Sequence, residues 1–283
     1  MNSFQINVFY TLLKREMWEH RLLFVGAPLV LALLILVAIL WIALQPGAGF
    51  LADALRQADL AFEGLPVLQL APFLFWAGLP FIILLYVCCI IYLLSTLYQD
   101  RKDSSIFFWQ SMPVSNCTTV MSKVVTVCAV APLATVFVLF ILFCLAAMLI
   151  AVFGVAWDLE YVSYWRAVAA SLVTLMLIYL SAVMSSLWLL PTIGWFLLFS
   201  AFARSVPLLW AIGAAVLIGF LEDMIFSTQY LGNWVQSRSN FNQYILFEFQ
   251  EIPAKVFNYD MMIGIALGSL LIAGATYMRR FID

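Results

Sequence analysis

Residues 22–44 read LLFVGAPLVLALLILVAILWIAL, a run of 23 residues without an Asp, Glu, Lys or Arg. An α-helix rises ~1.5 Å per residue, so about 20 apolar residues cross the ~30 Å hydrocarbon layer of a bilayer. The run is therefore long enough to span a membrane. It also exceeds the roughly 7–15 apolar residues of a cleavable secretory signal, so we expect this span to remain in the mature protein.

The rest of the chain repeats this pattern. Of its 283 residues, 66% are hydrophobic and 10% are charged, whereas a soluble domain carries about 25% charged residues. A shorter run, 207–221, ends at Glu222 and Asp223 and could continue to residue 226 if the two acids face protein or water. The sequence thus predicts an all-α polytopic membrane protein with six transmembrane helices in one domain, 1–283. The four other uncharged runs are 71–97, 124–154, 167–189 and 261–278.

Charge decides between six spans and seven, because the apolar run 191–206 could also cross. With six spans, one side carries nine Lys or Arg and the other carries four. Basic segments stay cytoplasmic, so both termini are expected inside, whereas seven spans would place Arg279 and Arg280 outside. We therefore interpret 191–206 as an inner-face helix or an extension of the fourth span. The inner segments are 1–21, 98–123, 190–206 and 279–283, and the outer ones are 45–70, 155–166 and 222–260.

The segment before the first span has a helical pattern with two different sides. An amphipathic helix of this kind can lie in the membrane interface. We predict such a helix over residues 1–21, and a plain juxtamembrane extension remains the alternative. Its apolar side holds Ile6, Phe9, Leu13 and Met17, and its polar side holds Thr11, Lys14, Arg15 and Glu19.

Several kinds of chemistry are missing from the sequence. The one histidine is His20, so a histidine-based zinc or catalytic site is not expected, and no metal or cofactor is predicted for this chain. The five clear spans hold no ionisable Asp, Glu, Lys or Arg of the kind that proton-driven carriers use. A nucleotide-binding GxxxxGK[ST] loop is absent, since no glycine is followed by lysine. We expect neither an enzyme nor a nucleic-acid partner.

A cytoplasmic loop stands out between the second and third spans. Residues 98–115 read YQDRKDSSIFFWQSMPVS, in which a charged tract precedes a bulky apolar cluster. This pattern suits a short helix whose polar end meets a soluble partner and whose aromatic end inserts into a groove. An interfacial loop anchored by aromatic residues, without a partner, is the alternative. The candidate contact residues are Asp100, Arg101, Lys102, Asp103, Ile106, Phe107, Phe108 and Trp109.

Here the chain resembles the permease subunits of type-2 ATP-binding-cassette exporters. These proteins have an amphipathic helix before six spans, and a cytoplasmic helix between spans two and three that docks on the ATPase. In that loop the charged tract is followed by Pro113, Val114 and Ser115, and Lys123 enters span three, as in the family. A second stretch, 194–210, reads GWFLLFSAFARSVPLLW and is similar to the inner segment between spans four and five. Its Arg204 is the second expected cytoplasmic contact.

The resemblance implies an assembly. Two permease chains, identical or different, would pair in the inner (plasma) membrane above separate ATPase subunits that bind ATP and Mg. Glu222 and Asp223 would line the outer part of the transport pathway. The spans suit a lipid, peptide or hydrophobic drug without identifying one. Two other classes stay open, an ion-coupled carrier or channel and a membrane scaffold or sensor that transports nothing.

Overall fold

The structure, a computed structural model, describes residues 3–45, 49–62, 65–103, 114–156, 164–240, 245–246 and 249–279. These residues form helices joined by short connections, with no strand among them. Six of the described helices are long and apolar enough to cross a membrane, which confirms the predicted number of candidate spans. They are Leu22–Ala43, Val67–Lys102, Asn116–Phe153, Val168–Trp188, Pro207–Phe226 and Tyr259–Met278.

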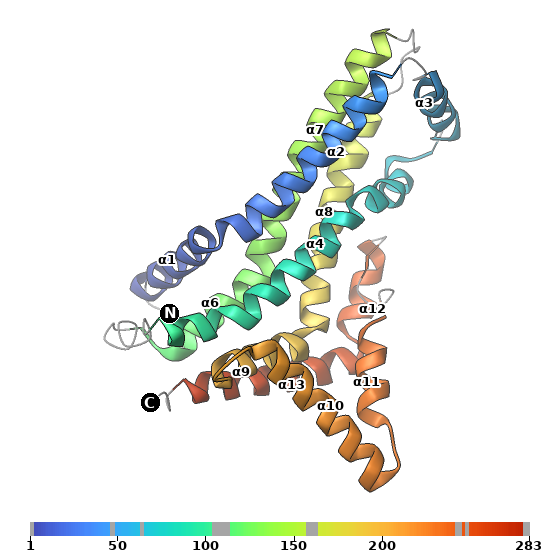
Figure 1. Ribbon diagram of the computed structural model, residues 1–283. Coiled ribbons are helices and arrows are strands. Elements are labelled where there is room, and N and C mark those ends of the chain that lie inside the picture. The colour runs from blue at the N-terminus through green and yellow to red at the C-terminus, as the bar shows by residue number, and fades with distance from the viewer. Residues whose placement is uncertain are drawn as a thin grey trace.

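The helices diverge from one end of the molecule. The start of α1 and the end of α13 lie together at the lower left of Figure 1, and from there α2, α4 and α7 run one way and α10 another. The first half comprises α1 (Ser3–Glu19), η1 (Leu22–Gly26), α2 (Ala27–Ala43), α3 (Gly49–Phe62), α4 (Val67–Lys102), α6 (Asn116–Val125), η2 (Thr126–Val130) and α7 (Ala131–Ala156). The second comprises α8 (Tyr164–Trp188), α9 (Leu190–Phe202), α10 (Pro207–Phe226), α11 (Tyr230–Arg238), η4 (Phe249–Glu251), α12 (Ile252–Val256) and α13 (Tyr259–Met278).

Two π-helical turns interrupt the first and third spans at matching places. Each turn, η1 or η2, ends two residues before a proline, Pro28 or Pro132. A proline lacks the N–H that would bond four residues back, and its ring clashes with that carbonyl. The helix relaxes by widening its preceding turn, and such turns often mark functional regions. Both turns lie beside the side-chain cluster described below.

The run 191–206 forms a separate helix rather than a seventh span. α9 has 13 residues, fewer than the roughly 20 that a crossing needs, and a turn at Leu189 separates it from α8. It packs between α4, α10 and α13. Its buried residues include Gly194, Leu197 and Ser200. This short helix therefore connects the two halves of the fold at the end where the chain termini lie.

Glycine allows α9 and α13 to approach closely. A Cβ added to Gly268 would lie 2.6 Å from the backbone carbon of Leu190, too near for any side chain. Gly194 faces α13 in the same way, with 2.8 Å from its added Cβ to the carbonyl oxygen of Gly268. The GxxxG pattern formed by Gly264 and Gly268 thus serves packing within the chain.

We expect Gly268→Ala to lower the free energy of unfolding by about 1–3 kcal/mol, because the new methyl group must push the backbone of α9 away. Gly274→Ala on the same helix is the control, since its nearest neighbour is a flexible Leu198 methyl at 3.4 Å. Thermal unfolding of the purified protein measures both variants. Equal unfolding temperatures would show that the two helices do not pack as closely as described.

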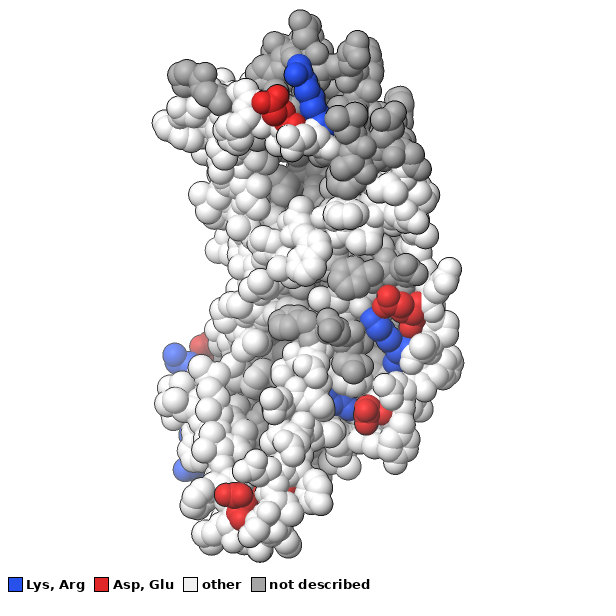
Figure 2. All heavy atoms as spheres, turned by 90° about the vertical axis from the view of Figure 1, so that its right-hand side faces the viewer, with Lys and Arg blue, Asp and Glu red and all other residues white. Residues whose placement is uncertain are grey.

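The surface agrees with a membrane protein in its composition. Figure 2 shows a face dominated by uncharged atoms, on which charged side chains form small, separated groups. Large exposed apolar residues are concentrated on α2 and α10, for example Leu33, Trp41, Val216 and Phe220, each more than half exposed. Lipid is the natural cover for such a surface. The chain is therefore a multi-pass membrane protein by helix length and surface character.

Candidate functional site

Four charged side chains are buried together where α1, α4, α6 and α13 meet. Glu16 of α1 is 1% exposed, Lys123 of α6 is 2% exposed and Arg279, directly after α13, is 2% exposed. Asp100 of α4 completes the set at 8%. We call these four residues the ion cluster. They come from segments up to 263 positions apart in the sequence (Glu16 to Arg279), so only the fold brings them together.

Lys123 is the centre of the ion cluster. Its Nζ donates to Glu16 Oε1 at 3.0 Å and to Thr96 Oγ1 at 2.6 Å, and it lies 3.6 Å from Asp100 Oδ2. The same Asp100 oxygen lies 3.6 Å from Arg279 Nη2. The Tyr92 hydroxyl donates to the other Glu16 oxygen at 2.6 Å. Two acids and two bases therefore balance in charge, which is the condition for burying ions at tolerable cost.

The electrostatics of the cluster favour the ionised carboxylate of Glu16. Burial alone would raise the pKa of Glu16, but the charge of Lys123 and the Tyr92 hydrogen bond outweigh it and hold this pKa below its ordinary value. Burial lowers the pKa of Arg279, which Asp100 opposes. Burial likewise lowers the pKa of His20, which stacks edge-on against Tyr92 at 4.8 Å between ring centroids.

The arginine at the edge of the cluster is incompletely satisfied. In the described part of the chain, Nε and Nη1 of Arg279 are buried without a hydrogen-bond partner, and so is Nε of Arg101. An unpaired buried donor costs about 1–3 kcal/mol, and native structures keep few of them. The ion cluster is therefore tightly joined, but not every donor of its arginine is hydrogen-bonded.

The contact residues predicted from the loop sequence differ in where they lie. Asp100 belongs to the ion cluster, whereas Lys102 and Asp103 are exposed. Arg101 points inward, and its Nη2 donates to the carbonyl oxygens of Ser200 and Ala203 at the end of α9. The remaining four predicted residues, Ile106, Phe107, Phe108 and Trp109, lie outside the described residues.

α9 is bonded to α4 at the same level. The Ser200 hydroxyl donates to the Leu94 carbonyl at 2.9 Å and accepts from the amides of Leu97 and Tyr98 at 3.2 and 3.1 Å. Arg204, the second predicted contact, is exposed just beyond the end of α9. The described start of the first stretch that carries the family resemblance, at Tyr98 and Arg101, thus lies beside Ser200 and Ala203 of the second.

Glu222 accepts hydrogen bonds from backbone amides at the start of α11. Its Oε1 accepts the amide of Tyr230 at 2.7 Å, and its Oε2 accepts the amide of Leu231 at 3.0 Å. The carboxylate therefore caps the first turn of α11, where unpaired amides and the helix dipole favour a negative charge. Asp223 beside it is exposed. The predicted role of these two acids in a pathway stays a prediction.

We expect Glu222→Gln to speed amide hydrogen exchange at Tyr230 and Leu231, because a neutral side chain caps the helix less strongly. The loss corresponds to about 1 kcal/mol for the first turn of α11. Asp223→Asn is the matched control and should leave both amides unchanged. Unaltered exchange in Glu222→Gln would mean that the carboxylate does not stabilise this turn.

A third buried cation, Arg238, lies outside the ion cluster and was not anticipated from the sequence. Arg238 at the end of α11 is 4% exposed and lies over the rings of Trp188 and Trp234, 4.3 and 4.8 Å from their centroids. Its guanidinium donates to the carbonyl oxygens of Trp188 and Asp260. A Cβ on Gly264 would lie 2.7 Å from its central carbon, so glycine makes the room. Arg238 thus fastens α8, α11 and α13 together.

Comparisons with known proteins identify no relative of this chain. No family model, curated protein or solved structure matches the chain. The resemblance to exporter permeases therefore rests on the number of apolar helices and on the two sequence stretches that were predicted to be cytoplasmic. Among the described residues, no group of His, Cys, Asp or Glu is arranged to hold a metal ion.

Sequence reasoning missed the most unusual residue of the site. Glu16 lies one helical turn after Leu12 and one before His20, on the face of α1 that is buried against α6 and η2. An acid within an otherwise buried stripe is the signal that could have revealed it. Arg279 was interpreted only as an inner positive charge, and Lys123 as an inner charge and a part of the loop pattern shared with exporter permeases. Their pairing with Glu16 and Asp100 is a property of the fold.

Proposed function

We propose that this chain is the membrane subunit of an ATP-driven exporter, moved by a separate ATPase that docks on the loop between α4 and α6. One observation carries the proposal. Asp100, before the loop, and Lys123, after it, both belong to the ion cluster. The two flanks of the loop are thereby joined to each other and, through Glu16 and Arg279, to α1 and to the end of α13.

This arrangement suits the transmission of a loop displacement to the other helices. A displacement of the loop moves α4 and α6, and the ion cluster carries it to α1 and α13, while Arg101 carries it to α9. Buried, hydrogen-bonded charge networks resist stretching because separating the charges leaves them unpaired in a poorly polarisable interior. The spans would then tilt together when the ATPase closes. ATP and Mg belong to that partner, and this chain supplies the pathway.

The proposal also covers the oligomeric assembly of the chain and its location in the cell. Two such chains, identical or different, pair around a central pathway in the inner (plasma) membrane with both termini in the cytoplasm. The support is the partition of basic residues and the common position of the two chain ends in Figure 1. Glu222 and Asp223 then lie at the outer side. The cargo is expected among lipids, peptides and hydrophobic drugs.

The docking loop can be tested with Ile106→Ala and Phe107→Ala in one chain. Truncating two interface anchors removes over about 1 kcal/mol each, so we expect weaker ATPase recovery in a pull-down and hydrolysis without transport. Ile6→Ala with Tyr10→Ala is the control, since both side chains are exposed on α1. Normal ATPase recovery with normal transport in the loop variant would refute docking there, and the exposed end of α9 around Arg204 would be examined next.

A further inference from the structure

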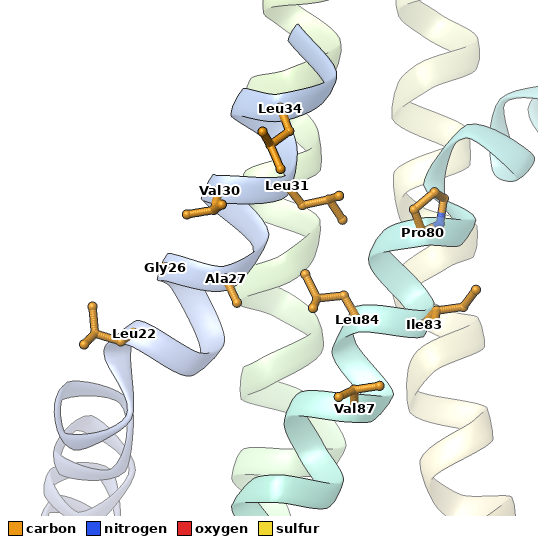
Figure 3. Close-up of a pocket in the computed structure, with 10 residues that line it drawn as sticks. All are labelled: Leu22, Gly26, Ala27, Val30, Leu31, Leu34, Pro80, Ile83, Leu84 and Val87. Carbon is orange, nitrogen blue, oxygen red and sulfur yellow. The ribbon is translucent and has the colours of Figure 1, made fainter. Parts of the chain in front are cut away.

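An apolar groove runs between the first two spans. It has a volume of about 840 Å³ and lies between η1 with α2 on one side and α4 on the other (Figure 3). Leu31 and Leu84 point toward each other across it in that view. All the residues that line it are apolar. The principal ones are Leu22, Gly26, Leu31 and Leu34 from the first span, and Pro80 and Leu84 from the second.

Small residues give the groove its depth. Gly26 has no side chain, and a Cβ added there would have Leu22 as its nearest neighbour at 3.6 Å, with the Arg21 carbonyl oxygen at 3.9 Å. Ala27 contributes a single methyl group to the same wall. The turn η1 lies at this level, and its residues Leu22 and Gly26 are part of the lining. The recess is therefore built into the sequence of the first span.

The length of the groove matches one leaflet of a bilayer. Its lining on the first span extends from Leu22 to Leu34, thirteen residues whose twelve steps rise about 18 Å at ~1.5 Å each. Half of the ~30 Å hydrocarbon layer is about 15 Å. A transmembrane helix from a second copy would need a contact face along the whole layer. The dimensions favour a single hydrocarbon chain that enters from one side.

Aromatic and charged side chains lie on α1, which precedes the groove-lining span in the chain. Trp18 lies four residues before Leu22, and Arg15 lies one helical turn before Trp18 on α1. Trp18 is 63% exposed, as suits a ring at the level of lipid headgroups. Arg15 pairs with Glu19 at 3.0 Å, so this end presents both a cation and a carboxylate. A headgroup that combines a phosphate with an amine complements this pair.

We propose that the groove binds one acyl chain of a membrane phospholipid, with the lipid phosphate at Arg15 and the ring of Trp18 beside the headgroup. Three features of the groove fit this occupant. Its length is close to that of one leaflet, its lining is uniformly apolar, and opposite charges lie at one end. The lipid would be held between α2 and α4 and would fill a space that the protein leaves empty. The inference concerns a bound lipid and holds whether or not the chain is an exporter subunit.

The test uses the full-length chain in vesicles of phosphatidylethanolamine and phosphatidylglycerol that contain a phospholipid with a photoreactive group on its acyl chain. Mass spectrometry then locates the labelled peptides. In the unmodified protein, label should concentrate on residues 22–34 and 80–87 rather than on the exposed apolar residues of α10. Even labelling of all exposed apolar helices would overturn the proposal, and this measurement requires no variant.

Two Ala→Leu variants on one helix sharpen the test. Ala27→Leu fills the groove and should abolish the concentrated labelling, whereas Ala38→Leu lies on an exposed part of α2 outside the groove and should preserve it. Both proteins must show the unfolding temperature of the unmodified chain. Undiminished labelling in Ala27→Leu would contradict the proposal. A shift of the Ala27→Leu variant to a smaller assembly would also contradict the proposal, because it would mean that the groove binds a second copy of the chain.

The headgroup is tested with Arg15→Gln and a second photoreactive probe, a diacylglycerol that lacks phosphate. In the unmodified chain the phospholipid should label the groove more strongly than the diacylglycerol. Arg15→Gln should reduce this ratio about fivefold, the equivalent of ~1 kcal/mol for one cation near a lipid surface. Equal labelling by both probes in the unmodified chain would refute the assignment of the phosphate to Arg15.

Discussion

Lys123→Met is expected to lower the free energy of unfolding by about 3–5 kcal/mol, because it leaves the buried carboxylates of Glu16 and Asp100 without their shared cation. Methionine keeps the apolar stem of the side chain, so the loss reports the charge and its hydrogen bonds. Chemical unfolding of the purified protein in micelles measures the change. Lys102→Met is the control, since Lys102 is exposed two residues beyond Asp100 and should cost little.

A second substitution separates charge pairing from packing. Adding Glu16→Gln to Lys123→Met removes the carboxylate charge that has lost its cation, so the double variant should be more stable than the sum of the two single effects predicts. Interacting residues in one network commonly show coupling of about 0.5–3 kcal/mol. Additive effects, or a Lys123→Met variant as stable as Lys102→Met, would show that the four charges do not form one unit.

Arg238→Met should be the other strongly destabilising change, by about 3 kcal/mol. The variant leaves the carbonyl oxygens of Trp188 and Asp260 without this donor, the bond to Trp188 being buried, and removes the cation that lies over two indole rings. Because Trp188 and Trp234 lose this neighbour, tryptophan fluorescence should change together with the unfolding temperature. Arg204→Met is the control at an exposed position. Identical behaviour of the two variants would contradict the described packing of α11.

The membrane-spanning helices could be predicted because their signal is local and additive. An uncharged run such as 22–44 must be helical in a bilayer, where every backbone group needs an internal partner. The run 191–206 was resolved by charge counting, and the structure indeed makes it a short separate helix. Helix α3 within 45–70 was not predicted, since that stretch was interpreted only as an outer segment between two spans.

The side-chain clusters could not be predicted, because they depend on residues far apart in the chain. Periodicity placed Ile6 on the apolar side of the first helix, yet Ile6 is 53% exposed and Glu16 is buried. The reason is Lys123, whose partnership 107 positions away makes burial of an acid favourable. Arg238 was counted only as an outer positive charge. Its burial depends on the space at Gly264, which a sequence does not display.

The central claim is that this chain supplies a pathway and a separate subunit supplies the energy. Native purification of the full chain from its own membranes, followed by an ATP hydrolysis assay, tests it most directly. We predict that an ATPase subunit co-elutes in a fixed ratio, that the assembly hydrolyses ATP, and that the chain stripped of this partner hydrolyses none. A chain that elutes alone and, in vesicles, takes up solute when only a proton gradient is applied would contradict the account.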